Sequence, residues 1–217
     1  SVEEAMKLIV SGGLYTPDEV VNKRGWEIYD EIIRRDPRVA TCMRFLKLAL
    51  VSGGAEIVPC DDTPEAEARA ESMRWNIDHG FRGEWSAVPH QMISALHDGV
   101  SINEKVHAIA EEGEYAGNVY LVAFKDRHPQ HFHFDQDVYG NLLSDGLVQF
   151  WHEGNEIRHS IADFVIYTHD SQFGNLYGRS LFQPIYEAFF CRQVLPRQIN
   201  VAVEKMGLGG LLVTVPK

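Results

Sequence analysis

The stretch RHPQHFHFDQD, residues 127–137, alternates aromatic and polar side chains, which predicts an extended strand. Successive side chains of a strand point to opposite faces, so Phe132 and Phe134 share one face. The opposite face carries two imidazoles and a carboxylate, those of His131, His133 and Asp135. Two interpretations are open. A buried aromatic face behind a polar one is typical of a half-buried strand, whereas His-x-His followed by a carboxylate suits zinc, iron or manganese.

Upstream of this stretch, caps and apolar spacing predict three helices. The first begins at the Asp36 cap with Pro37 in its first turn and ends at Gly53, the second covers residues 63–80, and the third covers residues 87–99. The side chains expected to face inward are Val39, Met43, Leu46 and Leu50 in the first helix and Val88, Met92 and Leu96 in the third. The N-terminal third of the chain is therefore expected to be mainly helical.

Around residues 127–137 the spacing of apolar side chains changes from the helical period to the alternation typical of strands. A short strand is expected at EIVPC, residues 56–60, before this region. From residue 100 onward, turn residues separate about five further strands, which we expect to form an antiparallel meander at residues 101–110, 118–124, 131–135, 147–152 and 163–169.

A long helix is expected to follow, from about Pro184 to Gly207, with Pro196 kinking it. Its apolar stripe consists of Ile185, Phe189, Leu195, Ile199 and Met206. Helices, then a sheet, then a helix predict the α+β class. Without a repeat or a Pro/Ser linker, residues 1–217 are expected to form one domain.

Composition narrows the function. The chain has 217 residues, of which 45% are hydrophobic and 24% charged, as in an ordinary globular protein. Its net charge of −11 argues against a protein that reads DNA sequence through a basic face, although a surface past which DNA slides should repel phosphates. The three cysteines form no C-x-x-C pair, and no apolar run is long enough for a membrane span. The last residues, LLVTVPK, resemble an incomplete strand pair, so we expect both ends to continue in a longer protein.

Motifs for chemistry are weak. GNLYGRS, residues 174–180, lacks the lysine and spacing of a phosphate-binding loop, and neither G-x-S-x-G nor H-E-x-x-H occurs. Glu104 shares a strand face with apolar side chains, so we expect it to be half-buried beside a partner such as an arginine. These observations predict no cofactor and no enzyme.

Four segments in order resemble the portal proteins of tailed bacteriophages, most nearly the Mu-like branch. They are DPRVATCMRFLKLALVSGGAEIVP, ISALHDGVSINEKVH, RHPQHFHFD and FGNLYGRSLFQPIYEAFF, at residues 36–59, 93–107, 127–135 and 173–190. The residues that match the family pattern are Asp36, Pro37, Pro59, Ala95, Gly99, Glu104, Arg127, Pro129, Phe132, Phe134, Asp135, Gly174, Tyr177 and Gly178. The pattern retains the two Phe and the Asp of the opening stretch but not its histidines, so His131 and His133 are expected on the outer face of a sheet.

The resemblance implies a structural subunit of a closed ring, usually of about twelve copies, at one vertex of a viral capsid. Such a ring passes double-stranded DNA during packaging and ejection, with only transient, non-specific contacts. It binds the major capsid protein, the packaging terminase and the head-tail connector, and has no membrane partner. The subunit would be made in the bacterial host cytoplasm and reside in the virion. What is present resembles the outer wing, so the clip, the crown and most of the stem are expected elsewhere in the longer subunit.

Two other functions remain possible from the sequence. One is a β-rich, metal-dependent enzyme whose ligands are His131, His133 and Asp135, with His152 or His169 as a further ligand. The other is a cytosolic adaptor that has the wing fold but forms no ring.

Overall fold

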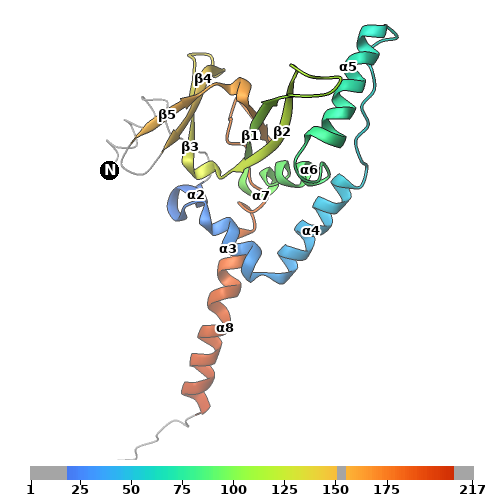
Figure 1. The fold of residues 1–217 in the computed structure, drawn as a ribbon. Helices are drawn as coiled ribbons and strands as arrows, with labels where there is room; N and C mark the ends of the chain where they lie inside the picture. The colour runs from blue at the N-terminus through green and yellow to red at the C-terminus, as the bar shows by residue number, and fades with distance from the viewer. Residues whose placement is uncertain (1–18, 151–154, 208–217) are drawn as a thin grey trace, which may run out of the picture. The chain divides into compact units, whose positions relative to one another are not determined.

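The computed structural model describes residues 19–150 and 155–207 (Figure 1). Two compact units divide the chain, Ser1–Leu181 and Phe182–Lys217. The strand expected at residues 211–217 and the candidate ligand His152 lie outside the described residues.

The described helices of the first unit follow one another along the N-terminal half of the chain. They are α2 (Glu19–Arg24), α3 (Glu27–Arg35), α4 (Pro37–Val51), α5 (Pro64–Trp75), α6 (Ala87–Met92) and α7 (Ala95–Asp98). Two predicted caps are confirmed. The Asp36 carboxylate accepts from the amide of Arg38 at 3.0 Å, and the Thr63 hydroxyl accepts from the amide of Ala66 at 3.3 Å. Proline follows each cap, where its missing amide proton costs no helical hydrogen bond.

Three helical predictions need correction. In α4 only Met43 of the expected inward stripe is fully buried, and Leu46 and Leu50 are exposed, because α4 packs on α3 and α6, which are both shorter than α4. EIVPC forms no strand, since no described strand pairs with it; the Ile57 carbonyl accepts instead from the Arg74 guanidinium at 3.0 Å. The third helix is divided into α6 and α7.

The second predicted helix ends at Gly80, as predicted, but its last turn is a π-helix for a tertiary reason. After α5 the chain forms a π-helical turn, η1 (Asn76–Gly80). The Asn76 side chain donates to the Leu121 carbonyl at 2.7 Å and accepts from the Leu121 amide at 2.9 Å. Gly80 lies so close to the Tyr120 ring that a Cβ would be 2.7 Å from it. The turn therefore joins α5 to the strand at residues 119–127, a contact that the spacing of apolar residues in the sequence does not predict.

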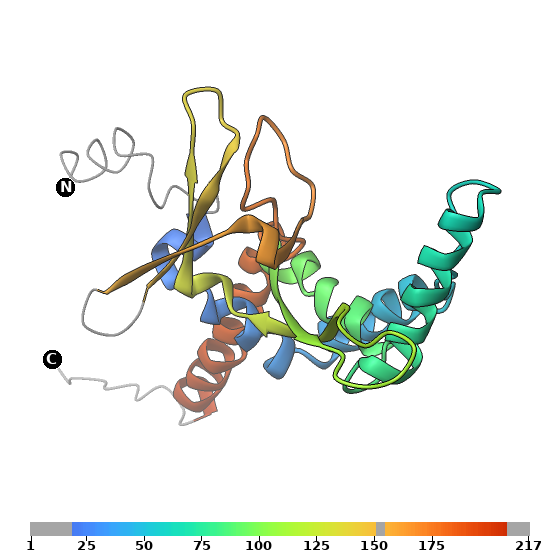
Figure 2. The same ribbon diagram turned by 45° about the horizontal axis from the view of Figure 1, so that its top comes forward.

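The described strands form two three-stranded antiparallel sheets. One has the order β2-β1-β6, with β1 (Val100–Ile109), β2 (Val119–Arg127) and β6 (Phe164–Thr168); the other has the order β3-β4-β5, with β3 (Phe132–Gln136), β4 (Leu142–Phe150) and β5 (Glu156–His159). Figure 2 separates the two sheets, with β3 and β4 in yellow and β1 and β2 in green.

The α+β class is confirmed, but the strands do not form one continuous meander. Strand β6 pairs with residues Val100 to Glu104 of β1, so it is an edge strand of the first sheet although β3, β4 and β5 precede it in the sequence. Strand β5 was not predicted, because its four residues, EIRH, carry a single apolar side chain. These pairings connect segments far apart in the sequence and depend on packing that a local pattern does not contain.

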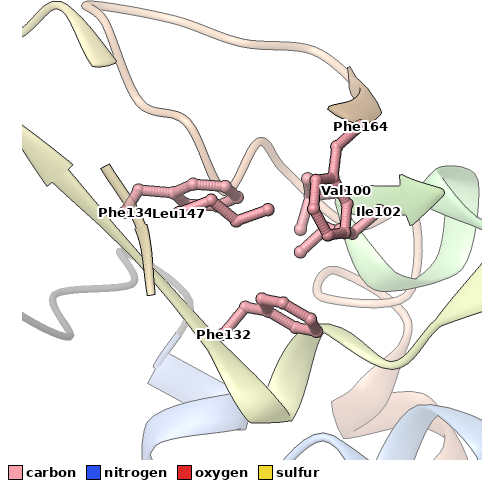
Figure 3. Packing of buried hydrophobic residues seen from close by; sticks show 6 residues of the cluster. All are labelled: Val100, Ile102, Phe132, Phe134, Leu147 and Phe164. Carbon is pink, nitrogen blue, oxygen red and sulfur yellow. The ribbon is translucent and has the colours of Figure 1, made fainter. Parts of the chain in front are cut away.

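A shared core joins the sheets. Its buried members are Val100, Ile102, Phe132, Phe134, Leu147 and Phe164. In Figure 3 their side chains point toward one another from β1 and β6 on one side and from β3 and β4 on the other. Phe132 and Phe134 are each 3% exposed, which confirms the predicted aromatic face of the opening stretch.

The second unit contains α8 (Tyr186–Gly207), a helix of 22 residues with Pro196 inside it. It begins two residues after Pro184, which therefore does not occupy the first turn as predicted. Apolar side chains along its second half are exposed: Leu195, Ile199, Val201, Val203 and Met206. Of the helices in the described ranges, none combines the length and apolar character that crossing a bilayer requires.

Candidate functional site

Two glycines of the sequence motifs meet where the helices join the first sheet. Gly99 ends α7 with φ +88°, and Gly178 lies in the loop after β6 with φ +65°. A Cβ on Gly99 would lie 2.5 Å from the Tyr177 carbonyl oxygen, and one on Gly178 would overlap the carbonyl oxygens of Gly99 and His169. Only glycine fits at either position, because both the positive φ and the missing side chain are needed.

Backbone hydrogen bonds fasten the loop at this contact. The His169 amide donates to the Gly99 carbonyl at 2.8 Å, and the Arg179 amide donates to the His169 carbonyl at 2.9 Å. The Leu181 amide donates to the Leu96 carbonyl at 2.9 Å. We name the segments 96–99, 168–169 and 174–181 together the glycine junction. It joins the end of α7, the end of β6 and the loop that follows β6.

Tyr177 connects the glycine junction to the second sheet. Its hydroxyl accepts from the Phe134 amide at 3.3 Å, and the two rings meet edge to face with centroids 4.9 Å apart. Burial raises the pKa of Tyr177 to about 12, so the hydroxyl stays protonated at physiological pH. The Asn175 side chain shapes the loop by accepting from the Tyr177 amide at 2.9 Å and donating to the Gly178 carbonyl at 2.9 Å.

Glu104 has the partner that the sequence predicted. The Arg127 Nε donates to Glu104 Oε2 at 2.9 Å, across the pair of strands β1 and β2. Both side chains are partly exposed, so this ion pair holds the strand register without a buried charge. Residues 127–137 therefore contact β1 through Arg127 and contribute Phe132 and Phe134 to the core.

The prediction that His133 lies on an exposed face is wrong. Its side chain is buried, with 8% of the residue exposed, because its ring stacks on Phe150 with centroids 4.6 Å apart. His133 Nε2 lies 3.2 Å from Asp135 Oδ1, and the Arg158 guanidinium donates to Asp135 Oδ2 at 2.6 Å. Asp135 thus joins β3 to β5 through an ion pair.

His131 is exposed, as predicted, but it is not part of the strand. It ends the 3₁₀ turn η2 (Pro129–His131), and its Nε2 lies 3.1 Å from the Gln130 side-chain nitrogen. The structure therefore does not bring His131 to the His133–Asp135 pair. Within residues 19–150 and 155–207, no three His, Cys, Asp or Glu side chains are placed to hold a metal ion.

One titratable pair of the glycine junction was not predicted. His97 Nε2 lies 3.2 Å from Asp98 Oδ2, directly before Gly99, and both side chains are nearly buried. Burial, with the nearby charge of Asp30, raises the pKa of Asp98 to about 8. Burial, with the Lys47 charge, lowers the pKa of His97 to about 4. The sequence shows only two polar residues at the end of a helix, where side chains are usually exposed, so it does not indicate that this pair is buried.

Comparison with known protein families shows to which family the chain belongs. A family model described as the portal protein of Mu bacteriophage matches residues 26–217. The chain belongs to this portal protein family. Among curated proteins, none matches the chain. The family is structural rather than enzymatic and belongs to the viral capsid.

Most motif residues of the portal chain surround the core and the glycine junction. Gly99, Tyr177 and Gly178 form the junction itself, and Phe134 contacts it. Pro59 lies apart from both, whereas Gly174 begins the junction loop. Pro59 is half-buried in the extended segment before α5. Gly174 has φ +74° with open space where a Cβ would be, and its carbonyl accepts from the Gln136 side chain at 3.2 Å.

Proposed function

We propose that the portal chain is a subunit of a closed ring at a capsid vertex, through which double-stranded DNA enters and leaves the head. The observation that carries the proposal is the family match over residues 26–217. A ring requires head-to-tail contacts between two different surfaces of each subunit, with about twelve copies closing the circle. In this proposal residues 1–217 are a wing-like domain, and the clip, the crown and most of the stem belong to a longer subunit.

The exposed apolar side chains of α8 are evidence in favour of the proposed ring. Four of its exposed apolar side chains follow the spacing of one helix face: Leu195, Ile199, Val203 and Met206. An exposed apolar stripe of this length is typical of a contact surface. In the assembled portal this stripe packs toward the ring axis or against a neighbouring subunit.

The charge distribution supports a conduit rather than a DNA-recognition protein. The chain has 20 Lys and Arg against 31 Asp and Glu, so few phosphate contacts can release counterions. The densest basic group is Arg34, Arg35 and Arg38, and Arg35 already pairs with Glu31 at 3.0 Å. DNA therefore passes with weak, sequence-independent contacts, and this basic group can equally face a carboxylate-rich subunit.

The same proposal gives the partners and the location. The ring would be made in the bacterial host cytoplasm, would bind the major capsid protein, the packaging terminase and the head-tail connector proteins, and would remain in the virion.

Mass measurement and negative-stain microscopy of the full-length chain at micromolar concentration and ~0.15 M salt test the ring. The proposal expects closed rings of about a dozen subunits. A stable monomer would refute it. Titration with labelled duplexes of different sequence tests the conduit, and tight binding to one sequence would indicate a DNA-recognition protein instead.

A further inference from the structure

We propose that the outer face of α4 is the surface on which the next copy of the chain docks, and that the docking element is the end of the β1–β2 hairpin. This inference rests on the proposed ring and names the two surfaces that form its head-to-tail contact.

The outer face of α4 is apolar and basic. Phe45 and Leu48 are 74% and 61% exposed, on the side of the helix away from the buried Met43. Arg38 and Cys42 share that side by helical spacing and are also exposed. Residues 37–51 contain three basic side chains and no acidic one. A large apolar surface of this kind on a helix marks an interaction site rather than an ordinary solvated face.

The end of the β1–β2 hairpin has the opposite character. Ile109 and Val119 are cross-strand partners and are 63% and 66% exposed. Three exposed carboxylates follow in the turn, those of Glu111, Glu112 and Glu114. No Lys or Arg occurs from residue 106 to residue 124. The hairpin end is therefore an aliphatic pair bordered by acid.

The hairpin end is held in place before it meets a partner. The Tyr115 ring contacts the Trp75 ring of α5, with centroids 4.8 Å apart. Figure 1 shows the turn between β1 and β2 beside α5 and apart from α4. Such preorganisation lowers the entropy lost on binding.

The two surfaces are complementary and distinct. Aliphatic side chains of the hairpin face aromatic and aliphatic side chains of α4, and the acidic turn faces the exposed Arg38 and Arg44. Lys47 is half-buried on the inner side of α4, where its charge acts on His97 and Asp98. Complementary charge favours this pairing over contacts of α4 with a second α4, where like charges would repel. Because the surfaces differ, the contact is heterologous and can propagate around a ring.

Charge reversal tests the contact in the full chain. Arg38→Glu with Arg44→Glu should raise the protein concentration required for half-assembly by about tenfold, and Glu111→Lys with Glu112→Lys should do the same. Mixing the two doubly reversed chains should restore rings in which they alternate, because each acidic α4 then meets a basic hairpin end and each basic α4 an acidic one. Combining all four changes in one chain should also restore the ring. The control Arg69→Glu reverses an exposed charge on α5 and should leave assembly unchanged.

Apolar substitution gives a second measurement. Phe45→Ser should reduce the ring fraction at least as strongly as the charge reversals, while Val138→Ser, at a fully solvated turn, should not. Below the concentration at which rings form, melting temperatures should match the parent chain in every variant, since each changed side chain is exposed. Rings that assemble normally with Arg38→Glu, Arg44→Glu and Phe45→Ser would overturn the docking surface and leave the ring itself intact. A parent chain that forms no ring would refute the proposed function and this inference with it.

A cysteine pair locates the contact. Cys42 lies on the outer face of α4, so Glu112→Cys in a chain carrying Cys60→Ser and Cys191→Ser should form disulfides between neighbouring copies on mild oxidation. A ladder of covalent oligomers up to the ring supports the docking surface. Assembled rings that yield only monomers after oxidation would contradict it.

Discussion

Gly178→Ala tests the backbone contact at the centre of the glycine junction. The substitution adds one carbon, at a residue whose φ is +65°, in a space already occupied by the carbonyl oxygens of Gly99 and His169. Neither oxygen can rotate away, because each belongs to the main chain. The strands and the loop must therefore separate, or the variant must lose its native conformation here.

The cost has three parts. Placing alanine in the left-handed region costs about 1–2 kcal/mol. Overpacking the contact adds about 1–3 kcal/mol. Separation also lengthens the hydrogen bond from the His169 amide to the Gly99 carbonyl, which is 2.8 Å in the native chain, and this adds up to about 1 kcal/mol. We therefore expect Gly178→Ala to lower the free energy of unfolding by about 4 kcal/mol, which for a chain of this size is a fall in Tm of about 10 °C.

Gly174→Ala is the matched control. Gly174 has φ +74°, in the same loop, with nothing within 4 Å of the position of a Cβ. Only the conformational cost applies, so we expect a loss of about 1–2 kcal/mol. Gly99→Ala should resemble Gly178→Ala, and the double variant should lose less than the two single losses added together, because both disrupt one contact.

Circular dichroism during thermal and urea unfolding measures these differences. Equal losses for Gly174→Ala and Gly178→Ala would show that backbone conformation alone matters, and would refute the close approach of the two segments. A Gly178→Ala chain as stable as the parent would also refute it.

Two further predictions concern the core and the buried pair. Phe134→Ala should cost about 3–5 kcal/mol in a denaturant titration, because its ring is buried between the sheets, whereas Phe173→Ala, at a fully exposed ring, should cost nothing measurable; equal stability of the two variants would contradict the placement of Phe134. With the pKa of Asp98 raised to about 8 and that of His97 lowered to about 4, the folded pair keeps one proton over that range. The unfolded chain loses its histidine proton near pH 6.5, so stability should fall as pH rises from 6.5 to 8, and a parent chain without that fall, or an Asp98→Asn chain that retains it, would refute the assignment.

Local chemistry made part of the fold predictable. The caps at Asp36 and Thr63 act within three residues of themselves, and the alternation that buries Phe132 and Phe134 is a property of any strand with one covered face. Both were therefore visible in the sequence. The burial of His133 was not, because it depends on the Phe150 ring, which a neighbouring strand supplies.

The site was less predictable than the fold. The glycines at 99 and 178 were identified as motif residues, but nothing in the sequence indicates that the Gly99 carbonyl fills the space of a Gly178 side chain, or that the Tyr177 carbonyl fills that of a Gly99 side chain. The Tyr177 hydroxyl bond to the Phe134 amide also joins distant segments. Pairing of β6 with β1 brings these segments together, and that pairing follows from collapse around the shared core rather than from local propensity.

The position of the glycine junction connects these findings to the proposed ring. Gly99 ends α7 and β1 starts at the next residue, so the backbone at this glycine sets the direction of β1 relative to the preceding helices. One end of that arrangement is α6, which packs on α4, and the other is the far end of β1, which carries the β1–β2 hairpin. If α4 of one subunit receives the hairpin of the next, the angle between these two elements determines the rotation from subunit to subunit. Closing a ring of about twelve requires about 30° at every contact, a geometry that tolerates little variation. A Gly99 held against the Tyr177 carbonyl oxygen, rather than a flexible hinge, is the backbone arrangement that such a constraint requires.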